Sequence, residues 1–252
     1  MVKVVILGLG NVGLHLCKAL ELNSQVLLLQ NYNRKGIQIE NSEIPVTNEI
    51  SKIVLADVYI ITYNDNALTE VYSKLKSLEG LVVHTSGATP MNALANFENY
   101  GVFYPVQSFN KEIPIDFSEI PIAVEANTKY NEDVLLKLAQ KLTDQTYLIN
   151  SEQRNALHIA AVFANNFSNF MYVQANNICE DFKIDFNILK PLITQTIQKL
   201  KNTDPKYLQT GPAIRRDSKT IDRHLDTIKQ DSQKELYAVL TEAIQTYYEK
   251  EL

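Results

Sequence analysis

Three glycines near the start of the chain have the spacing of a nucleotide-binding turn. Gly8, Gly10 and Gly13 form the pattern GxGxxG, and they directly follow the apolar residues 4–7. Such an unbroken apolar run is typical of a parallel strand covered on both faces. The glycines permit a tight bend, a close approach of the backbone to a pyrophosphate, and close packing of the following helix, whose first N–H groups are free for phosphate. We therefore predict a dinucleotide site made by Gly8, Leu9, Gly10, Asn11, Val12 and Gly13.

The residues that follow the second predicted strand, residues 25–30, favour NADP over NAD. NAD sites usually place Asp or Glu at the end of this strand, about 20 residues after the glycines, to bind the ribose 2′-hydroxyl. This chain has no acid there before Glu40 and carries Asn33, Arg34 and Lys35 instead. Arg34 and Lys35 could bind a 2′-phosphate, with Asn33 donating a hydrogen bond. The alternative is a solvated basic turn.

Further candidates lie where predicted strands end, which is the edge of an α/β sheet that holds ligands. Thr62 ends the strand predicted at 58–62 and is a candidate cofactor ligand. Ser86 follows the strand predicted at 81–84 and could contact cofactor or substrate. Tyr104 begins the loop 104–109 and is a candidate substrate ligand. Thr89 and Pro90 are expected to start a helix, because they suit the cap and the first position.

A long helix predicted at 152–182 has no Asp, Glu, Lys or Arg between Arg154 and Glu180. A solvent-facing helix of this length normally carries charges on its outer face. Its many polar side chains argue against a membrane span, so we expect the helix to be buried in protein. At 100° per residue a polar stripe falls within about 40° of one line, formed by His158, Asn165, Asn169, Tyr172 and Asn176. Such amides need partners: a ligand, another chain, polar loops, or simply one another.

Hydride transfer to a carbonyl or imine also requires a proton donor, and histidine suits this task near neutral pH. His158 is our candidate, with Asn165 or Asn166 orienting the substrate. Arg215 could bind a carboxylate or phosphate, because residues 199–223 hold seven Lys or Arg against three Asp. We predict an NADP(H)-dependent oxidoreductase acting on a small C=O or C=N compound. The alternative is a non-catalytic NADP-binding sensor whose helical domain docks a partner.

The order of predicted elements indicates two domains. Strands and helices alternate as far as residue 149, which is typical of a doubly wound, mostly parallel α/β sheet. After Asn150 the pattern becomes helical, with a break expected at Pro191 and helices at 218–228 and 232–249. We predict a Rossmann-like NADP-binding domain at 1–150 and an all-α substrate and dimerisation domain at 151–252.

The overall composition excludes several classes of protein. A net charge of −5 in 252 residues argues against nucleic acid or an anionic membrane as a partner. Cys17 and Cys179 have no metal or redox spacing, so we expect no metal and two buried thiols in a reducing compartment. No 18-residue apolar run and no signal segment are present, and a cytoplasmic protein is expected.

Six segments together resemble a known family: GLGNVG, ADVYIITYND, VVHTSGA, YPVQSF, LHIAAVFANNFSN, and TGPAIRRD with a following RHL. This family, usually labelled putative NADP oxidoreductase, pairs an NADP-type Rossmann domain with a helical domain of unassigned function. The first domain is also similar to pyrroline-carboxylate reductases and deazaflavin-dependent NADP reductases. The second resembles a short form of the 6-phosphogluconate dehydrogenase type, which commonly dimerises through its long helix. The resemblance implies the fold, NADP and a homodimer, and it names no substrate.

The sequence departs from these relatives at two places. The 3-hydroxyacid dehydrogenases place an acid–base lysine four residues before an asparagine on this helix. Here Ala161 precedes Asn165 and Val162 precedes Asn166, so the lysine is absent, which favours the sensor. The polar stripe near the predicted cleft favours the enzyme. The family also usually reads Arg-Gly-Asp after the Gly-Pro turn, whereas Arg216 replaces the glycine here.

Overall fold

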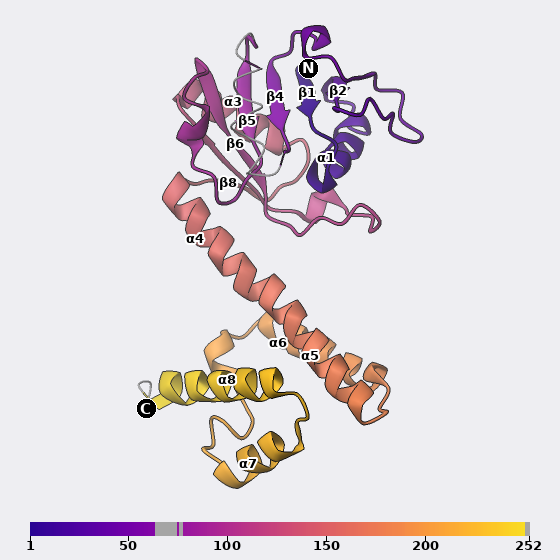
Figure 1. Cartoon of the computed structure of the whole chain (residues 1–252). Helices are drawn as coiled ribbons and strands as arrows, with labels where there is room; N and C mark the ends of the chain where they lie inside the picture. Colours follow the sequence, from indigo (N-terminus) through magenta and orange to yellow (C-terminus); the bar gives the residue numbers. More distant parts are fainter. Residues whose placement is uncertain (64–74, 76–77, 250–252) are drawn as a thin grey trace. The chain divides into compact units, whose positions relative to one another are not determined.

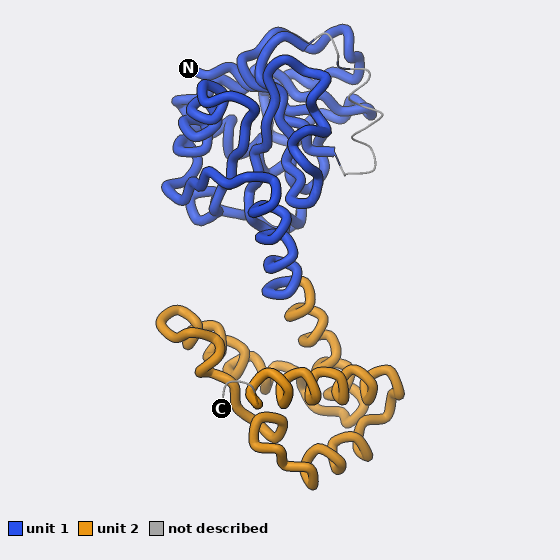
Figure 2. Tube along the Cα trace, turned by 90° about the vertical axis from the view of Figure 1, so that its left-hand side faces the viewer, with its two compact units in different colours: residues 1–165 blue, residues 166–252 orange. Residues whose placement is uncertain are grey.

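The computed structural model describes residues 1–63, 75 and 78–249. It divides into two compact units, residues 1–165 and 166–252, which Figure 2 shows in different colours. Each unit is described by itself below. No helix in the described ranges is long and apolar enough to cross a bilayer.

The first unit is built on one sheet of eight strands in the order β3-β2-β1-β4-β5-β6-β7-β8 (Figure 1). Every neighbouring pair is parallel except β6 and β7. The doubly wound, mostly parallel sheet is therefore confirmed. The strands are β1 (Val2–Leu7), β2 (Val26–Tyr32), β3 (Val46–Thr47), β4 (Val58–Ile61), β5 (Leu81–His84), β6 (Asn99–Pro105), β7 (Ile122–Ala126) and β8 (Thr146–Leu148).

The apolar strands have this sequence because both faces of the sheet are covered. Val4 and Ile6 of β1 face a core beneath the helices α1 (Asn11–Glu21) and α3 (Lys129–Ala139). Val5 and Leu7 face a second core on the opposite side. All four side chains are fully buried. Burial on both faces removes the alternation of polar and apolar residues that an exposed face would produce.

The segment after β5 differs from its prediction. In place of a helix capped by Thr89, there is a short 3₁₀ turn, Met91–Leu94, whose preceding residue Pro90 provides no side-chain cap. Since β6 already begins at Asn99, there is no room for a longer helix between Pro90 and that strand. In the loop before the turn, the Ser86 hydroxyl accepts the Thr89 N–H at 2.9 Å.

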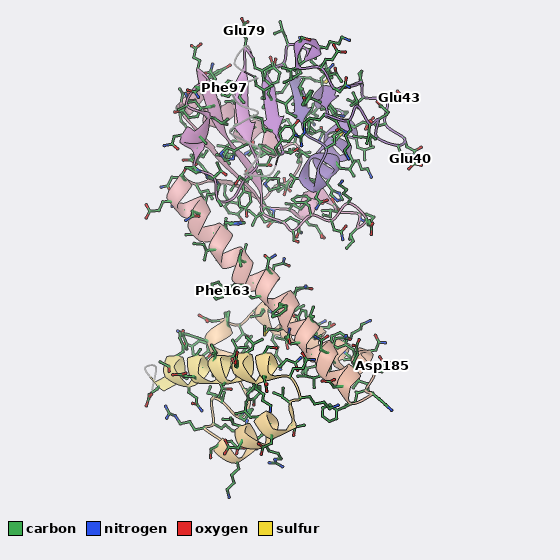
Figure 3. The ribbon with its side chains drawn as sticks, in the orientation of Figure 1. Glu40, Glu43, Glu79, Phe97, Phe163 and Asp185 are labelled. Carbon is green, nitrogen blue, oxygen red and sulfur yellow. The ribbon has the colours of Figure 1, made fainter. Side chains whose placement is uncertain are left out.

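The predicted long helix consists of α4 (Ser151–Ala161) and α5 (Ser168–Asp181), joined by a π-helical turn, Val162–Phe167. A π turn closes its hydrogen bonds over five residues, so the positions after it no longer follow the 100° rotation used to draw the polar stripe. The expected burial is also not met within one chain. Phe163, labelled in Figure 3, is 64% exposed, and Phe170 is 49% exposed.

The second unit contains helices from α5 onward. Pro191 stands at the start of α6, directly after the 3₁₀ turn Phe186–Leu189, so the expected break at this proline is confirmed. Proline is tolerated in the first turn of a helix, where its missing N–H would be unpaired in any case. The remaining helices are α6 (Lys190–Leu200), α7 (Ser218–Thr227) and α8 (Asp231–Glu249).

Candidate functional site

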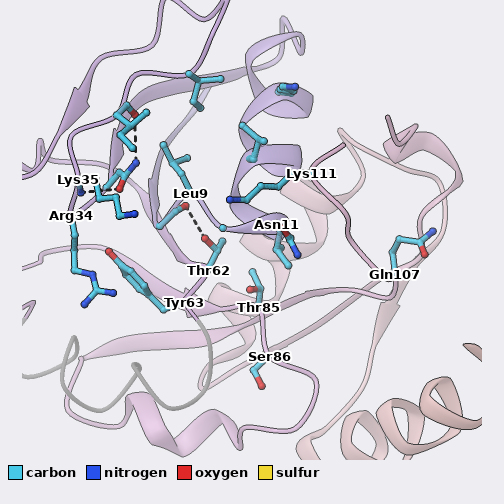
Figure 4. Close-up of a pocket in the computed structure, with 18 of the residues that line it drawn as sticks. Leu9, Asn11, Arg34, Lys35, Thr62, Tyr63, Thr85, Ser86, Gln107 and Lys111 are labelled. Atoms are coloured by element: carbon cyan, nitrogen blue, oxygen red, sulfur yellow. Dashed lines mark hydrogen bonds between the residues drawn. The ribbon is translucent and has the colours of Figure 1, made fainter. Parts of the chain in front are cut away.

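A cavity of about 940 Å³ opens at the carboxyl ends of the central strands. It lies where the strand order reverses, since β1 pairs with β2 on one side and with β4 on the other. Open α/β sheets bind ligands at this switch point. In the close-up of Figure 4, Arg34 and Tyr63 lie together at one end, Asn11 lies beside the start of α1, and Ser86 lies at the far side.

The glycine turn is held by contacts that leave its backbone open to the cavity. Gly8 has φ +114°, which favours glycine, and its carbonyl oxygen accepts the Thr62 hydroxyl at 2.8 Å. A Cβ on Gly13 would overlap that same carbonyl oxygen, so the helix can approach only without a side chain there. Helix α1 has no acidic residue in its first turn. Its start therefore presents N–H donors and a positive dipole end without a competing carboxylate.

One end of the cavity is basic. Arg34 and Lys35 line it, and the Asn33 side chain supports their turn by accepting the Lys35 N–H at 3.0 Å. Its amide is thus already engaged in the turn. Across the whole cavity the described lining residues include four cations and one carboxylate, although the chain is acidic overall; these are Lys18, Arg34, Lys35, Lys111 and Glu40. The cavity is suited to an anionic ligand.

The other end holds two ionisable rings. The Tyr104 hydroxyl and the His158 Nδ1 share a hydrogen bond of 3.3 Å, and the rings meet edge to face at 73°. Both rings pack against Gly87, where an added Cβ would lie 2.6 Å from the His158 Nδ1 and 2.9 Å from the Tyr104 Cζ. Ser86 lines the same end. This arrangement provides a group that can give up a proton beside the sheet edge.

A buried arginine fixes this end of the cavity. Arg154 of α4 is 1% exposed, and its Nη1 pairs with the Glu125 carboxylate at 3.3 Å. Its Nη2 donates to the Thr89 carbonyl oxygen at 2.6 Å, and its Nε donates to the Ser86 carbonyl oxygen at 3.3 Å. The Glu125 carboxylate also accepts the Ser151 N–H and hydroxyl. These contacts tie the start of α4 to the loop after β5.

Burial dominates the electrostatics of these groups. Burial raises the pKa of Tyr104, while the nearby Arg154 charge acts in the opposite direction. Burial likewise raises the pKa of Tyr63 at the basic end, partly offset by Arg34. The pKa of Arg154 is lowered by burial, with Glu125 and then Tyr104 acting to raise it. The charge of Arg154 therefore acts to lower the pKa of Tyr104, and Tyr104 acts to raise the pKa of Arg154.

The cavity brings together most of the residues that the sequence singled out. Lining it are Gly8, Leu9, Gly10, Asn11, Val12, Asn33, Arg34, Lys35, Thr62, Ser86, Tyr104 and His158. Gly13 packs behind the turn instead. Asn165 is exposed on the π turn and does not line the cavity, and Asn166 and Arg215 belong to the second unit. The roles assigned to all these residues stay predictions.

Several lining or supporting residues were missed. Tyr63, Gln107 and Lys111 line the cavity, and Arg154 supports it from below the surface. Arg154 lies four residues before His158, which puts both side chains on one face of a helix. The four-residue spacing from His158 could have identified Arg154 from the sequence. The sequence of the loop carrying Gln107 and Lys111 gives no comparable signal, because its path depends on contacts such as that between His15 Nε2 and the Asn110 carbonyl oxygen, at 2.8 Å.

Comparison with known proteins places this architecture in a family. Residues 120–244 match the family described as a domain of unknown function (DUF2520). A crystal structure of a "putative NADP oxidoreductase" from Bacteroides fragilis is 34% identical, with a TM-score of 0.88, and the match covers 97% of this chain and 98% of that one. Comparison with curated proteins gives no match.

Two more distant structures share the fold. A protein from Thermotoga maritima is 18% identical, with a TM-score of 0.74, over 98% of this chain and 99% of that one. Pyrroline carboxylate reductase from Plasmodium falciparum, solved with NADP bound, is 11% identical, with a TM-score of 0.59, over 97% of this chain and 98% of that one. The chain thus has the fold of dehydrogenases and reductases.

Proposed function

Because the chain belongs to the same family as the "putative NADP oxidoreductase" from Bacteroides fragilis, we propose that it transfers hydride between NADP(H) and a small C=O or C=N compound. The observation that supports this function is the continuity of one cavity. It extends from Arg34 and Lys35 past the glycine turn to Tyr104 and His158. A cation pair, a phosphate-binding turn and a proton donor are the three parts that such a reaction needs.

Each part of the cavity has a task in this proposal. Arg34 and Lys35 bind the 2′-phosphate, and the N–H groups of the glycine turn and of α1 bind the pyrophosphate. The bound cofactor supplies or accepts the hydride at the end near Ser86. His158 supplies the proton that accompanies reduction, because an imidazole changes charge near neutral pH.

The cofactor preference is tested by calorimetric titration of NADPH and NADH. We expect NADPH to bind more tightly by about tenfold to a hundredfold, since charge-assisted hydrogen bonds from Arg34 contribute roughly 1.5–3 kcal/mol. Arg34→Ala should remove most of this preference and leave NADH affinity nearly unchanged. Lys52→Ala is the matched control, because it removes a cation that is exposed and outside the cavity. Equal affinity of the wild type for both cofactors would contradict the proposal.

Catalysis is tested with NADPH and a panel of small ketones, aldehydes and cyclic imines. Oxidation of NADPH that depends on the added compound supports the reductase. Tight binding of NADPH with no turnover across the panel instead favours a sensor. His158→Ala should lower turnover by about 10²–10⁴-fold and leave the Kd of NADPH nearly unchanged.

A further inference from the structure

We propose that Tyr104 is the residue that hands the proton to the substrate, that His158 restores this proton, and that Arg154 positions both rings. This inference rests on the proposed reductase function and deepens it. It concerns the order in which the proton moves through a pair of rings that lie in hydrogen-bond contact at the end of the cavity.

The first argument is the burial of the two rings. Tyr104 is 7% exposed and lies at the end of β6, next to the carboxyl edge of the sheet. His158 is only half-buried, and it contacts the Tyr104 hydroxyl through Nδ1. A proton taken from solvent therefore reaches the more accessible His158 first. Tyr104 is the member of the pair that lies deeper.

The second argument is charge. Tyr104 becomes an anion when it gives up its proton, and the Arg154 guanidinium beside it stabilises that anion. A protonated His158 would instead be a second cation in the same place. Glu125 offsets part of the Arg154 charge through the 3.3 Å ion pair, yet Arg154 is the charge that acts on Tyr104. Burial raises the pKa of Tyr104, and the Arg154 charge offsets part of that rise. The phenol can therefore act as terminal donor beside a buried cation that would repel an imidazolium.

The third argument is support. Arg154 contacts the carbonyl oxygens of Ser86 and Thr89, and His158 packs on Gly87 between them. Since Arg154 and His158 are four residues apart on α4, one face of that helix contacts the whole loop. Arg154 therefore holds the loop against which the Tyr104 and His158 rings pack.

The resulting step balances in atoms and electrons. The substrate carbon accepts a hydride from NADPH, and the π electrons of its C=O or C=N bond move to the oxygen or nitrogen. That atom takes the proton from the Tyr104 hydroxyl. The phenolate takes the proton from His158 Nδ1 while the other ring nitrogen accepts one from water, which leaves hydroxide in the bulk solvent. Proton exchange of the ring with solvent then returns a proton to Nδ1 before the next turnover. Oxidation follows the same steps in reverse.

The proton pair is tested by NMR titration of the full chain with ¹³C-labelled tyrosine and histidine. Arg154→Met should raise the pKa of Tyr104, because it removes the stabilising cation. Glu125→Gln is nearly isosteric and should lower that pKa, since the Arg154 charge loses its partner. Tyr104→Phe should change the ring signals of His158, because it removes the hydrogen bond to Nδ1. Thr128→Ala, at the start of α3, is a control that should change neither the pKa of Tyr104 nor the His158 ring signals.

Opposite shifts of Tyr104 in the two charge variants support the proposal, and no shift in either overturns it. If Arg154→Met does not fold, Glu125→Gln decides the sign alone. NADPH binding is measured on the same samples, so a failure of the proposed function appears as absent binding with the shifts intact.

With any compound of the panel that is reduced, Tyr104→Phe should lower kcat by about 10²–10⁴-fold with little change in KM. His158→Gln should be partly rescued by added imidazole. Wild-type turnover in Tyr104→Phe would overturn the inference.

Discussion

At the scale of single residues, Gly10 and Gly87 both line the cavity, but the space that surrounds them differs. An added Cβ at Gly10 would be 3.8 Å from its nearest neighbour, the Thr62 carbonyl oxygen, and its φ of −73° suits alanine. An added Cβ at Gly87 would meet the rings of His158 and Tyr104 below 3.0 Å. We therefore expect the open space beside Gly10 to admit the proposed cofactor, whereas the space beside Gly87 is filled by the two rings.

These two glycines give a paired prediction. Gly10→Ala should leave the free energy of unfolding within about 0.5 kcal/mol of wild type and weaken NADPH binding at least about tenfold. Gly87→Ala should cost about 1–3 kcal/mol, as for overpacking, and shift the His158 ring signals in NMR spectra. Urea unfolding and calorimetry measure both. A Gly10→Ala variant that unfolds easily, or a Gly87→Ala variant with unchanged ring signals, would contradict this assignment.

Arg216 carries backbone strain. It has φ +53°, a region that favours glycine. Its side chain pairs with Glu249 at 3.1 Å, but both groups are exposed, and such pairs contribute little. We expect Arg216→Gly to stabilise the protein by about 1 kcal/mol in urea unfolding. Arg216→Ala is the control, since it removes the ion pair and keeps the strain. If both substitutions change the free energy of unfolding equally, backbone strain at residue 216 is not the cause.

At the scale of elements, the start of α4 determines where His158 lies. The Asn150 side chain accepts the Gln153 N–H at 2.8 Å, and the Gln153 side chain accepts the Asn150 N–H at 3.0 Å. This reciprocal capping box defines the first turn of the helix. The Ser151 contacts with Glu125 join that turn to β7.

We therefore expect Asn150→Ala to lower the free energy of unfolding by about 1 kcal/mol and to shift the His158 ring signals. Thr128→Ala removes the corresponding cap of α3, where the Thr128 hydroxyl accepts the Asn131 N–H. It should lower the free energy of unfolding by a similar amount and leave the His158 ring signals unchanged, because the residues that line the cavity do not come from α3. Urea titration and NMR spectra of the two variants provide the comparison. Identical ring signals in both would remove the link between this cap and the site.

The elements also show what sequence alone can and cannot predict. Residues 81–84 were predicted as a strand with the observed bounds, because a buried apolar run has one simple interpretation. The π turn was not predicted, since side-chain periodicity over six residues cannot distinguish it from α-helix. Glycine spacing predicted the tight turn between β1 and α1 that lines the cavity, whereas the role of Gly87 depends on two rings brought from distant segments. Contacts of that kind have no local signal.

At the scale of the whole molecule, the hydrophobic core is unevenly distributed. The three buried clusters among the described residues all lie within residues 1–165. In the described part of 166–252, the apolar residues classed as buried are Cys179, Ala213 and Ile228. A folded unit of this size normally buries well over half of its surface. The exposed aromatic and aliphatic side chains of α5 therefore require a cover, among them Phe170, Tyr172 and Val173.

We propose that a second copy of the chain provides this cover. Light scattering at micromolar concentration should give about twice the 28.6 kDa of one chain. Phe170→Asp should yield monomers with lowered stability, because it introduces a charge into an apolar interface. Tyr130→Asp is the control, as Tyr130 is 76% exposed on α3 in the first unit. A wild-type mass near 28.6 kDa would contradict the dimer.

One cysteine is buried in each unit, Cys17 within α1 and Cys179 within α5. Burial raises the pKa of the Cys17 thiol to about 11, so at neutral pH almost none of it is the thiolate that alkylating reagents attack. Because both thiols are buried, modification of either cysteine requires local opening of the unit that contains it. The chain carries two native reporters of local opening, and mass spectrometry of one alkylated sample can separate the unfolding rate of the sheet from that of the helices.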